Sequence, residues 1–467
     1  MDPTARRASG RTEPAASRGL CERFLGLFTV VRPGEAPKAL LLGLDIYLLL
    51  LAYYLIKPVR NALLLAGNDA KVQSYLGAAQ AILFIFVVKA FSSLASRFPR
   101  HVLIAGVTLF FASNLVLFYA AHVAGLALRP MGIAFFTWVG IFNYLVVAQF
   151  WGFANDLYSE EAGKRLFPLI AFGATFGAVS GSQIADWLIG PLGVYRMMLV
   201  SAAVLAVTVL LAVRVHHLAV RGCAGTLADR TEERRLAVKV QEEPLKKGGG
   251  FRLVFKSRYL LYIALLIGVY NFINATGEYI LNDVSRRAAL QAIQAGTAGG
   301  LSLEQIIGRF FAEYQLLTNL LALVIQLFLV SRIFKWIGVG GALFVLPFIA
   351  LGGYGYVAFG ASLLLIKWVK ALENGTDYSL MNTTRAALFL ITPREEKYKA
   401  KAAIDTFFVR GGDALAAISV FIGTTWFSLR IERYAIINVA MIVVWLGLCA
   451  LILREYKAKK ARNGSGN

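Results

Sequence analysis

Long apolar stretches alternate with short polar ones along the whole chain. Several of them, including 39–56, 102–121 and 436–453, approach or reach the roughly 20 residues that a helix needs to cross a bilayer. Their apolar residues are continuous, whereas the strands of a membrane barrel alternate apolar and polar residues over about 10 positions. Because lipid offers the backbone no hydrogen bonds, continuous apolar segments must cross it as helices. The pattern predicts an all-α polytopic membrane protein.

Charged residues, prolines and glycines divide the chain into twelve expected membrane helices. These lie near 39–63, 74–95, 102–123, 131–157, 167–188, 194–215, 259–282, 311–331, 338–357, 359–381, 402–427 and 434–453. Loops after even-numbered helices are rich in Lys and Arg, and the other loops are poor in them. By the positive-inside rule, both termini and the central loop are cytoplasmic. Two six-helix halves of the same orientation are typical of transporters.

These boundaries predict five parts of the chain. An N-terminal cytoplasmic tail, 1–37, contains apolar residues at helical spacing near 20–31, which indicates a short helix on the membrane surface. A six-helix bundle at 38–216 is joined by a cytoplasmic linker, 217–258, to a second bundle at 259–455, and a tail follows at 456–467. The stretch 283–310, with its glycines and small residues, is expected to be an external loop.

Composition and charge argue against several classes of function. The chain has 48 Lys and Arg against 27 Asp and Glu, a net charge of +21, and much of this excess follows from the topology, so nucleic-acid binding is a minor interpretation. Three cysteines, far apart, suggest neither a disulfide framework nor a metal site. The sequence contains no phosphate-binding Gly-Lys-Ser/Thr loop. We therefore expect neither an enzyme nor a cofactor.

Ionisable residues within the expected spans are the main candidates for a functional site, because a charge in lipid is costly unless it faces a cavity or a partner. Lys57 and Arg60 lie three positions apart in the first helix, so both can point into one cavity. Pro58 between them is expected to bend the helix. Alternatively, both side chains reach lipid headgroups at the outer interface.

Two acids in other expected helices are further candidates. Asp156 ends the fourth helix, and Glu278 follows Asn271 and Asn274 in the seventh. Glu278 with these amides resembles the wall of a polar cavity. Asp156 is alternatively an ordinary acid of the loop that follows.

The tenth expected helix is the most charged. Lys370 shares an arc of about 120° with four other polar residues, Lys367, Glu373, Asn374 and Asp377. These form either a structural ladder of ion pairs or a substrate-binding face. Arg385 projects from the same side if the helix continues. Several cations in one cavity suit a phosphorylated anion, since Lys and Arg bind phosphate oxygens by charge-assisted hydrogen bonds.

Four segments resemble signatures of the plastid and bacterial ATP/ADP translocases. Residues 150–156 read Phe-Trp-Gly-Phe-Ala-Asn-Asp, and 164–169 read Lys-Arg-Leu-Phe-Pro-Leu. Residues 378–385, Tyr-Ser-Leu-Met-Asn-Thr-Thr-Arg, and 399–405, Lys-Ala-Lys-Ala-Ala-Ile-Asp, are similar to two further family motifs at the same separation. The first-helix segment 56–63 is a weaker match. The resemblance implies a major-facilitator-like architecture.

The resemblance also implies which residues carry transport. By motif position, the family's two essential cations and two essential acids correspond to Arg60, Arg385, Asp156 and Glu278. Two family lysines are arginines here, and three negative positions are lost. The acid after the first-helix cation is Asn61, and the tenth-helix Asp-Pro-Thr-Lys-Glu corresponds to Asn-Thr-Thr-Arg-Ala at 382–386. These changes indicate a divergent member.

The main hypothesis is a nucleotide exchanger, ATP against ADP or a related pair, that works by alternating access. Arg60 and Arg385 would bind phosphate, Asp156 and Glu278 would pair with them in the empty state, and Lys57 and Lys370 would extend the positive surface. The alternatives are a proton-coupled transporter of another anionic solute, with Glu278 or Asp156 titrating, and a membrane partner protein without transport activity. The composition favours a bacterial inner membrane, and such bundles can work as monomers.

Overall fold

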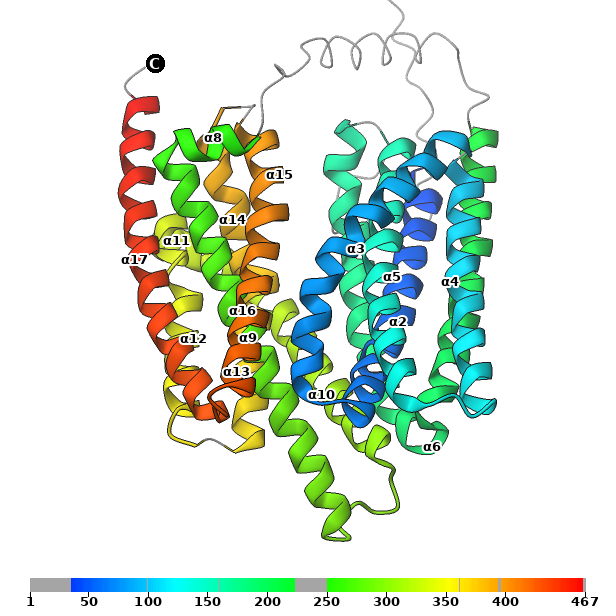
Figure 1. Ribbon diagram of the computed structural model, residues 1–467. Helices are drawn as coiled ribbons and strands as arrows, with labels where there is room; N and C mark the ends of the chain where they lie inside the picture. The colour runs from blue at the N-terminus through cyan, green and yellow to red at the C-terminus, as the bar shows by residue number, and fades with distance from the viewer. Residues whose placement is uncertain are drawn as a thin grey trace, which may run out of the picture.

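A computed structural model of the chain describes residues 35–98, 100–158, 160–222, 250–360, 362–393 and 396–464. The expected surface helix near 20–31 and most of the 217–258 linker lie outside these residues. Two helical bundles stand side by side (Figure 1). The all-α fold class predicted from the apolar pattern is confirmed.

The N-terminal bundle is built from five long helices. They are α2 (Ala36–Gly67), α3 (Ala70–Arg97), α4 (Arg100–Val123), α5 (Leu128–Leu157) and α6 (Glu160–Gly222). Within α6, Gly193 has φ 77° and ψ 164°, a conformation that interrupts the helix and follows Pro191. Because glycine reaches positive φ without a steric penalty, this point divides α6 into two crossings, as the sequence predicted.

The C-terminal bundle contains several helices interrupted by π-helical turns. Its elements are α8 (Gly250–Lys256), α9 (Arg258–Gln294), α10 (Leu303–Val324), η1 (Ile325–Leu329), α11 (Val330–Ala342), α12 (Val345–Val357), α13 (Leu363–Thr376), η2 (Asp377–Met381), α14 (Asn382–Leu388), η3 (Phe389–Ile391), η4 (Glu396–Ala400), α15 (Lys401–Ala403), η5 (Ile404–Phe408), α16 (Val409–Thr425) and α17 (Ile431–Gly464). Gly338, with φ 68°, separates the α10 crossing from the α12 crossing.

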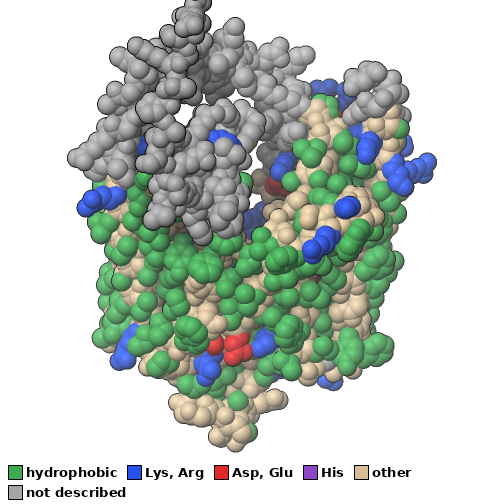
Figure 2. All heavy atoms as spheres, turned by 180° about the vertical axis from the view of Figure 1, so that it is seen from behind, with side chains coloured by type: hydrophobic (Ala, Val, Ile, Leu, Met, Phe, Trp, Pro, Cys, Tyr) green, Lys and Arg blue, Asp and Glu red, His purple; other side chains and the backbone are tan. Residues whose placement is uncertain are grey.

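Nine helical stretches in the described ranges are long and apolar enough to cross a membrane. The division of α6, the shorter apolar helix α12 and the α13–α14 segment supply the remaining crossings of the expected twelve. In Figure 2, apolar side chains cover the middle of the visible face, and Lys and Arg gather toward its two ends. This distribution is that of a multi-pass integral membrane protein.

The expected loop at 283–310 is mostly helical instead. Helix α9 continues to Gln294, and α10 begins at Leu303 after a capping box in which Ser302 and Gln305 bond each other's backbone. Arg287 pairs with Asp283 at 2.8 Å, one helical turn away. Charged residues signal the end of a membrane span, but they do not end a helix that continues beyond the lipid. We call this projecting end of the molecule the hairpin end, and the opposite end, where α2 begins and α17 finishes, the terminal end (Figure 1).

Helix α2 packs very closely against α6. A Cβ atom added to Gly173, Gly177 or Gly181 of α6 would collide with the carbonyl oxygens of Gly43, Tyr47 and Leu51 of α2. Small residues every fourth position allow such an approach, which replaces hydrophobic burial as the source of helix association in lipid. The same contact fixes the position of α2, which carries two of the candidate cations, and α2 runs through Pro58 as one helix.

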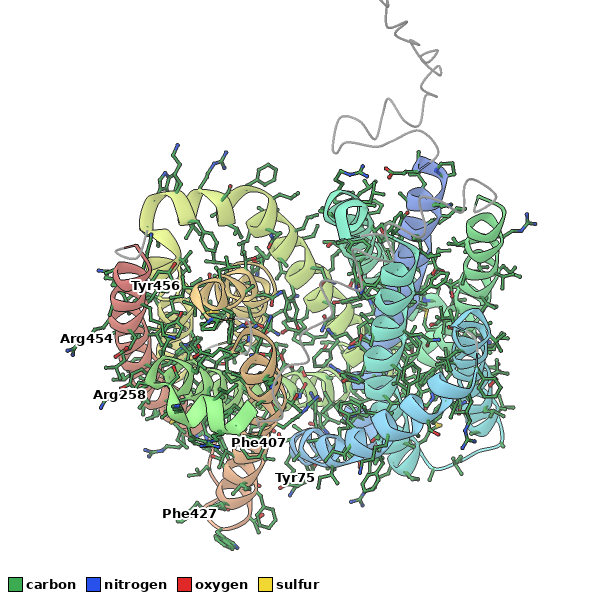
Figure 3. All side chains as sticks on the ribbon, turned by 90° about the horizontal axis from the view of Figure 1, so that it is seen from above. Tyr75, Arg258, Phe407, Phe427, Arg454 and Tyr456 are labelled. Carbon is green, nitrogen blue, oxygen red and sulfur yellow. The ribbon has the colours of Figure 1, made fainter. Side chains whose placement is uncertain are left out.

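Contacts between the two bundles involve α2, α3 and α6 on one side and α9, α10 and α16 on the other. Tyr75 of α3 lies at this junction in the view from the terminal end (Figure 3), and its ring is 6.0 Å from that of Phe421 on α16. The packing of the two bundles therefore places α2 against α10, which in turn packs against α13.

Candidate functional site

Lys57 of α2 lies at the junction of the bundles rather than at a lipid interface. Lys57 Nζ donates a hydrogen bond of 2.8 Å to Oε1 of Gln315 on α10, which crosses between the bundles. The ammonium group also lies 5.0 Å from the ring centroid of Tyr54 and 5.8 Å from that of Tyr53. Aromatic faces attract a cation without neutralising it. Lys57 is therefore held at the junction by an amide oxygen and two aromatic rings.

Arg60 has similar surroundings. Its Nε donates to Oδ1 of Asn61 at 3.1 Å, and its guanidinium carbon lies 4.6 Å from the ring centroid of Phe136 on α5. Asn61 occupies the position where the related motif has an acid. An amide oxygen accepts the hydrogen bond but leaves the positive charge uncompensated. Among the side chains that the structure describes, neither Lys57 nor Arg60 has a carboxylate within salt-bridge distance.

Lys370 lies in the interior of the C-terminal bundle, not on an open surface. The residue is 2% exposed, and its Nζ lies 3.2 Å from Oε1 of Glu373 and 2.6 Å from Oδ1 of Asn274. A Cβ on Gly277 would overlap the hydroxyl of Tyr354, which itself donates to Glu373 at 2.9 Å. The expected contribution of Lys370 to an open positive surface is therefore absent from this conformation, because its charge is buried and paired.

Glu278 connects this buried cluster to the junction. Its Oε1 lies 3.9 Å from Lys370 Nζ and accepts hydrogen bonds from Asn374 at 3.0 Å and from the Tyr314 hydroxyl at 3.4 Å. The Glu278 side chain is 26% exposed, against 3% for Lys370. Glu278 thus has one side toward the buried lysine and another toward solvent.

Arg385 pairs with an acid of its own helix. Its Nη2 lies 3.2 Å from Oδ1 of Asp377, and its guanidinium carbon lies 5.7 Å from the ring centroid of Tyr270. The intervening segment includes the π-helical turn η2. One extra residue in a turn rotates the rest of the helix, and such turns are common at functional sites. Two further π turns, η4 and η5, overlap the two ends of the segment 399–405.

Asp156 is the penultimate residue of α5, and its side chain lies outside the described part of the structure. Its pairing with Arg60 or Arg385 therefore stays a prediction. Glu278 contacts Lys370 and Arg385 contacts Asp377, so the pairing of Glu278 with an essential arginine is not the one found in this conformation.

Sequence reasoning missed the polar face of α10. Tyr314, Gln315, Thr318 and Asn319 are buried there, and Asn319 donates to Ser182 of α6 at 3.1 Å. Their spacing of one, three and four positions within an otherwise apolar span is the signal that could have identified this face.

Polar contacts that join the bundles concentrate toward the hairpin end. Arg286 Nε donates to the carbonyl oxygen of Leu65 at 2.9 Å, and its Nη1 lies 3.6 Å from Asp69. Gln305 donates to the carbonyl oxygen of Gly190 at 2.9 Å, and Arg309 lies 3.8 Å from Asp186. Among the described residues, no hydrogen bond or ion pair joins the bundles near the terminal end. This conformation is therefore closed at the hairpin end.

The arrangement is suited to binding an anion. The site has uncompensated cations on one bundle and a paired arginine with a partly exposed glutamate on the other. The described residues contain no cluster of three or more His, Cys, Asp or Glu side chains that could hold a metal ion.

Comparisons with known proteins give a family and related sequences for the chain. Residues 137–456 match the family described as TLC ATP/ADP transporter. The chain is 23% identical to ADP,ATP carrier protein 2 of Chlamydia pneumoniae, over 88% of this chain and 87% of that protein. It is also 23% identical to the protein of the same name from Chlamydia trachomatis, over 94% and 92%.

Solved structures share the fold at low identity. A bacterial homologue of the iron transporter ferroportin, in an inward-facing state, has a TM-score of 0.59 at 12% identity, over 89% of this chain and 98% of that chain. The nucleoside transporter NupG has a TM-score of 0.53 at 12% identity, over 90% and 98%. The likeness to these neighbours shows a shared helical-bundle fold, and the match over 137–456 shows that the chain belongs to the TLC ATP/ADP transporter family.

Proposed function

We propose that this protein exchanges nucleotides, ATP against ADP or a related pair, across a bacterial inner membrane. The observation that carries the proposal is the pair of α2 cations. Lys57 meets Gln315 at the bundle junction, Arg60 follows one turn later, and amide oxygens and aromatic rings hold both side chains. Because no described carboxylate neutralises them, a phosphate group can bind them without displacing an acid. Because the related proteins are ADP,ATP carriers, a nucleotide is the anion that we propose.

In this mechanism the two bundles contribute differently. Arg60 binds phosphate from the N-terminal bundle, with Lys57 beside it. Arg385, on the C-terminal bundle, binds phosphate once phosphate oxygens replace the Asp377 carboxylate as its partner. The contact between Glu278 and Lys370 then adjusts to the added negative charge. Asp156 is the remaining candidate, by motif position.

The distribution of contacts supports alternating access. A conformation closed at the hairpin end opens at the terminal end, which the charge pattern assigns to the cytoplasm. Return to the other state requires the contacts of Arg286, Gln305 and Arg309 to break. The chain can carry out this cycle as a monomer, since the site lies between its own two bundles.

Uptake of labelled ATP into proteoliposomes tests the proposal. Vesicles loaded with ADP should take up ATP, and empty vesicles should not. Unlabelled nucleotides should compete, and Arg385→Ala should abolish uptake while the variant still inserts and purifies normally. Normal uptake by the folded Arg385→Ala variant would disprove the role of this residue.

A proton-coupled transporter of another phosphorylated solute is the second candidate. It is favoured by the excess of acids in the C-terminal bundle, where Glu278, Glu373 and Asp377 surround two cations, Lys370 and Arg385. A protonophore should stop transport in that case. An exchanger needs only its counter-substrate, so its ADP-dependent uptake would be unaffected.

A further inference from the structure

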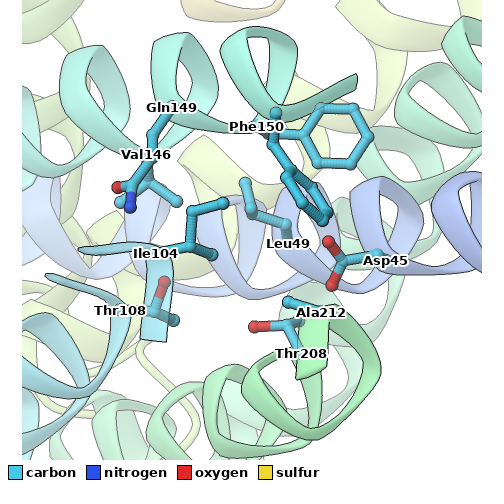
Figure 4. A pocket seen from close by; sticks show the side chains of 10 residues that line it. Asp45, Leu49, Ile104, Thr108, Val146, Gln149, Phe150, Thr208 and Ala212 are labelled. Carbon is cyan, nitrogen blue, oxygen red and sulfur yellow. The ribbon is translucent and has the colours of Figure 1, made fainter. Parts of the chain in front are cut away.

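The N-terminal bundle contains a small polar cavity that is separate from the bundle junction. It lies between α2, α4, α5 and α6 (Figure 4). Its polar lining residues are Asp45, Thr108, Gln149 and Thr208, and Leu49 and Ile104 are among the apolar ones. The volume open to the centre of a water molecule is about 10 Å³, which corresponds to a single water-sized occupant.

Two polar side chains of this cavity, Asp45 and Gln149, have atoms without hydrogen-bond partners. Asp45 and Gln149 are each 4% exposed. Asp45 Oδ1 and both polar atoms of the Gln149 carboxamide make no hydrogen bond to any described residue. An unsatisfied buried amide costs about 1–3 kcal/mol, and a lone buried carboxylate costs more. Such a set of groups requires an occupant or a bound proton.

The lining also defines the charge of that occupant. Asp45 is the one titratable residue among the residues that line the cavity, and no Lys, Arg or His is among them. Buried acids elsewhere in the described chain, such as Glu373 and Asp377, have basic partners. A single positive charge of about the size of water would balance Asp45.

The donor chemistry agrees with this charge. The carboxylate, carboxamide and hydroxyl oxygens are hard ligands, which suit alkali cations rather than soft metals. Thr208 donates its hydroxyl proton to the carbonyl oxygen of Leu205 at 2.7 Å, so its lone pairs remain as acceptors. Figure 4 shows Asp45 at one end of the cavity and Gln149 with Thr108 at the other.

The cavity cannot close by movement of α2. Gly43 and Tyr47, which flank Asp45, are the residues whose carbonyl groups pack against Gly173 and Gly177 of α6. This close contact holds the segment from the opposite side. We propose that the cavity binds one small monovalent cation, Na⁺ or H⁺, at the Asp45 carboxylate. The site is independent of the nucleotide site, because its lining shares no residue with the bundle junction.

The melting temperature of the purified full-length protein tests this proposal. At constant ionic strength, replacement of about 150 mM choline by Na⁺ should raise the melting temperature by about 2 °C or more if Na⁺ binds, because ligand binding stabilises the folded state. If the occupant is a proton, the melting temperature in choline should instead rise as the pH falls from about 8 to 5, because the folded state then binds a proton that the unfolded state does not.

Substitutions assign the effect to the cavity. Asp45→Asn removes the charge with little change of shape. Whichever dependence of the melting temperature the parent shows, on Na⁺ or on pH, should therefore disappear in this variant. Thr108→Val removes one oxygen ligand, so it should weaken the apparent Na⁺ affinity while a proton effect stays unchanged. Glu432→Gln, at an acid in the first turn of α17 away from the cavity, is the matched control and should behave as the parent does.

Either of two results would overturn the proposal. One is a parent protein whose melting temperature responds to neither Na⁺ nor pH, which would mean that the cavity holds only water. The other is an Asp45→Asn variant that retains the full response. Because the parent alone can give the first result, the test stands even if Asp45→Asn fails to fold.

Discussion

The cations of the two bundles are held in different surroundings. In the N-terminal bundle, Lys57 and Arg60 contact amide oxygens and aromatic rings. In the C-terminal bundle, Lys370 and Arg385 each lie 3.2 Å from a carboxylate oxygen. An anion can bind the first pair directly, whereas it must compete with acids for the second. The N-terminal bundle is therefore expected to supply most of the affinity for the anion. The C-terminal bundle is expected to exchange its ion pairs when the anion binds.

The largest expected effect concerns the buried pair of the C-terminal bundle. Lys370→Met leaves Glu373, which is 0% exposed, without its cation, and the free energy of unfolding should fall by about 3–5 kcal/mol. The combined Lys370→Met and Glu373→Gln variant removes both charges and should recover most of the loss. Thermal unfolding of the purified proteins measures both. Equal melting temperatures for the single variant and the parent would show that the pair does not stabilise the fold.

Removal of an N-terminal cation should affect transport rather than stability. Arg60→Ala should lower ATP uptake by about 10- to 100-fold, since a charge-assisted contact with phosphate is lost, and Arg60→Lys should retain part of the activity. Arg430→Ala, at an arginine whose side chain is 81% exposed, is the control. Unchanged uptake by Arg60→Ala would remove the proposed difference between the bundles.

Loss of a contact at the hairpin end should shift the balance between conformations. Arg286→Ala removes the bonds to Leu65 and Asp69, so the closed state should lose stability by roughly 1 kcal/mol, about a five-fold change in population. In a Ser182→Cys background, a maleimide that cannot cross the membrane is applied from the hairpin end. It should react with the introduced thiol about five times faster when Arg286→Ala is also present than when it is not. Arg287→Ala in the same background is the comparison, and an equal rate for both variants would contradict the assignment.

The smallest expected effect is the release of Arg385. Asp377→Asn removes the carboxylate but keeps a similar shape, so the KM for ATP should fall by about two- to five-fold. Competition curves against labelled ATP provide the measurement. A rise in KM would mean that Asp377 positions Arg385 for the substrate rather than competing with it.

Much of the fold was predictable because its signals are local. Continuous apolar stretches identified the crossings, and Gly193 divides α6 where a boundary was expected. The Lys370–Glu373 pair was among the expected contacts, since it depends only on the spacing within one helix. The 283–310 region was misassigned because polar composition identifies the end of a membrane span, not the end of a helix.

The site was predictable only in part. Charged residues in apolar spans pointed to Lys57, Arg60, Glu278, Lys370 and Arg385, but their partners on other helices were not evident. Lys57 meets Gln315, which is 258 positions away, and Asn374 meets Glu278, which is 96 positions away. The polar spacing on α10 was present in the sequence, yet its contacts depend on how α10 packs against α2 and α6.

The sequence by itself determined the helical class, the approximate spans, the family resemblance and the presence of charges that lipid cannot accept. These properties follow from the composition and periodicity of single segments. The tertiary structure decided which cations keep an uncompensated charge, which acids neutralise the others and where a buried carboxyl is left without a partner. Such differences depend on contacts of a few ångströms between helices distant in the chain, and helix packing alone sets those distances.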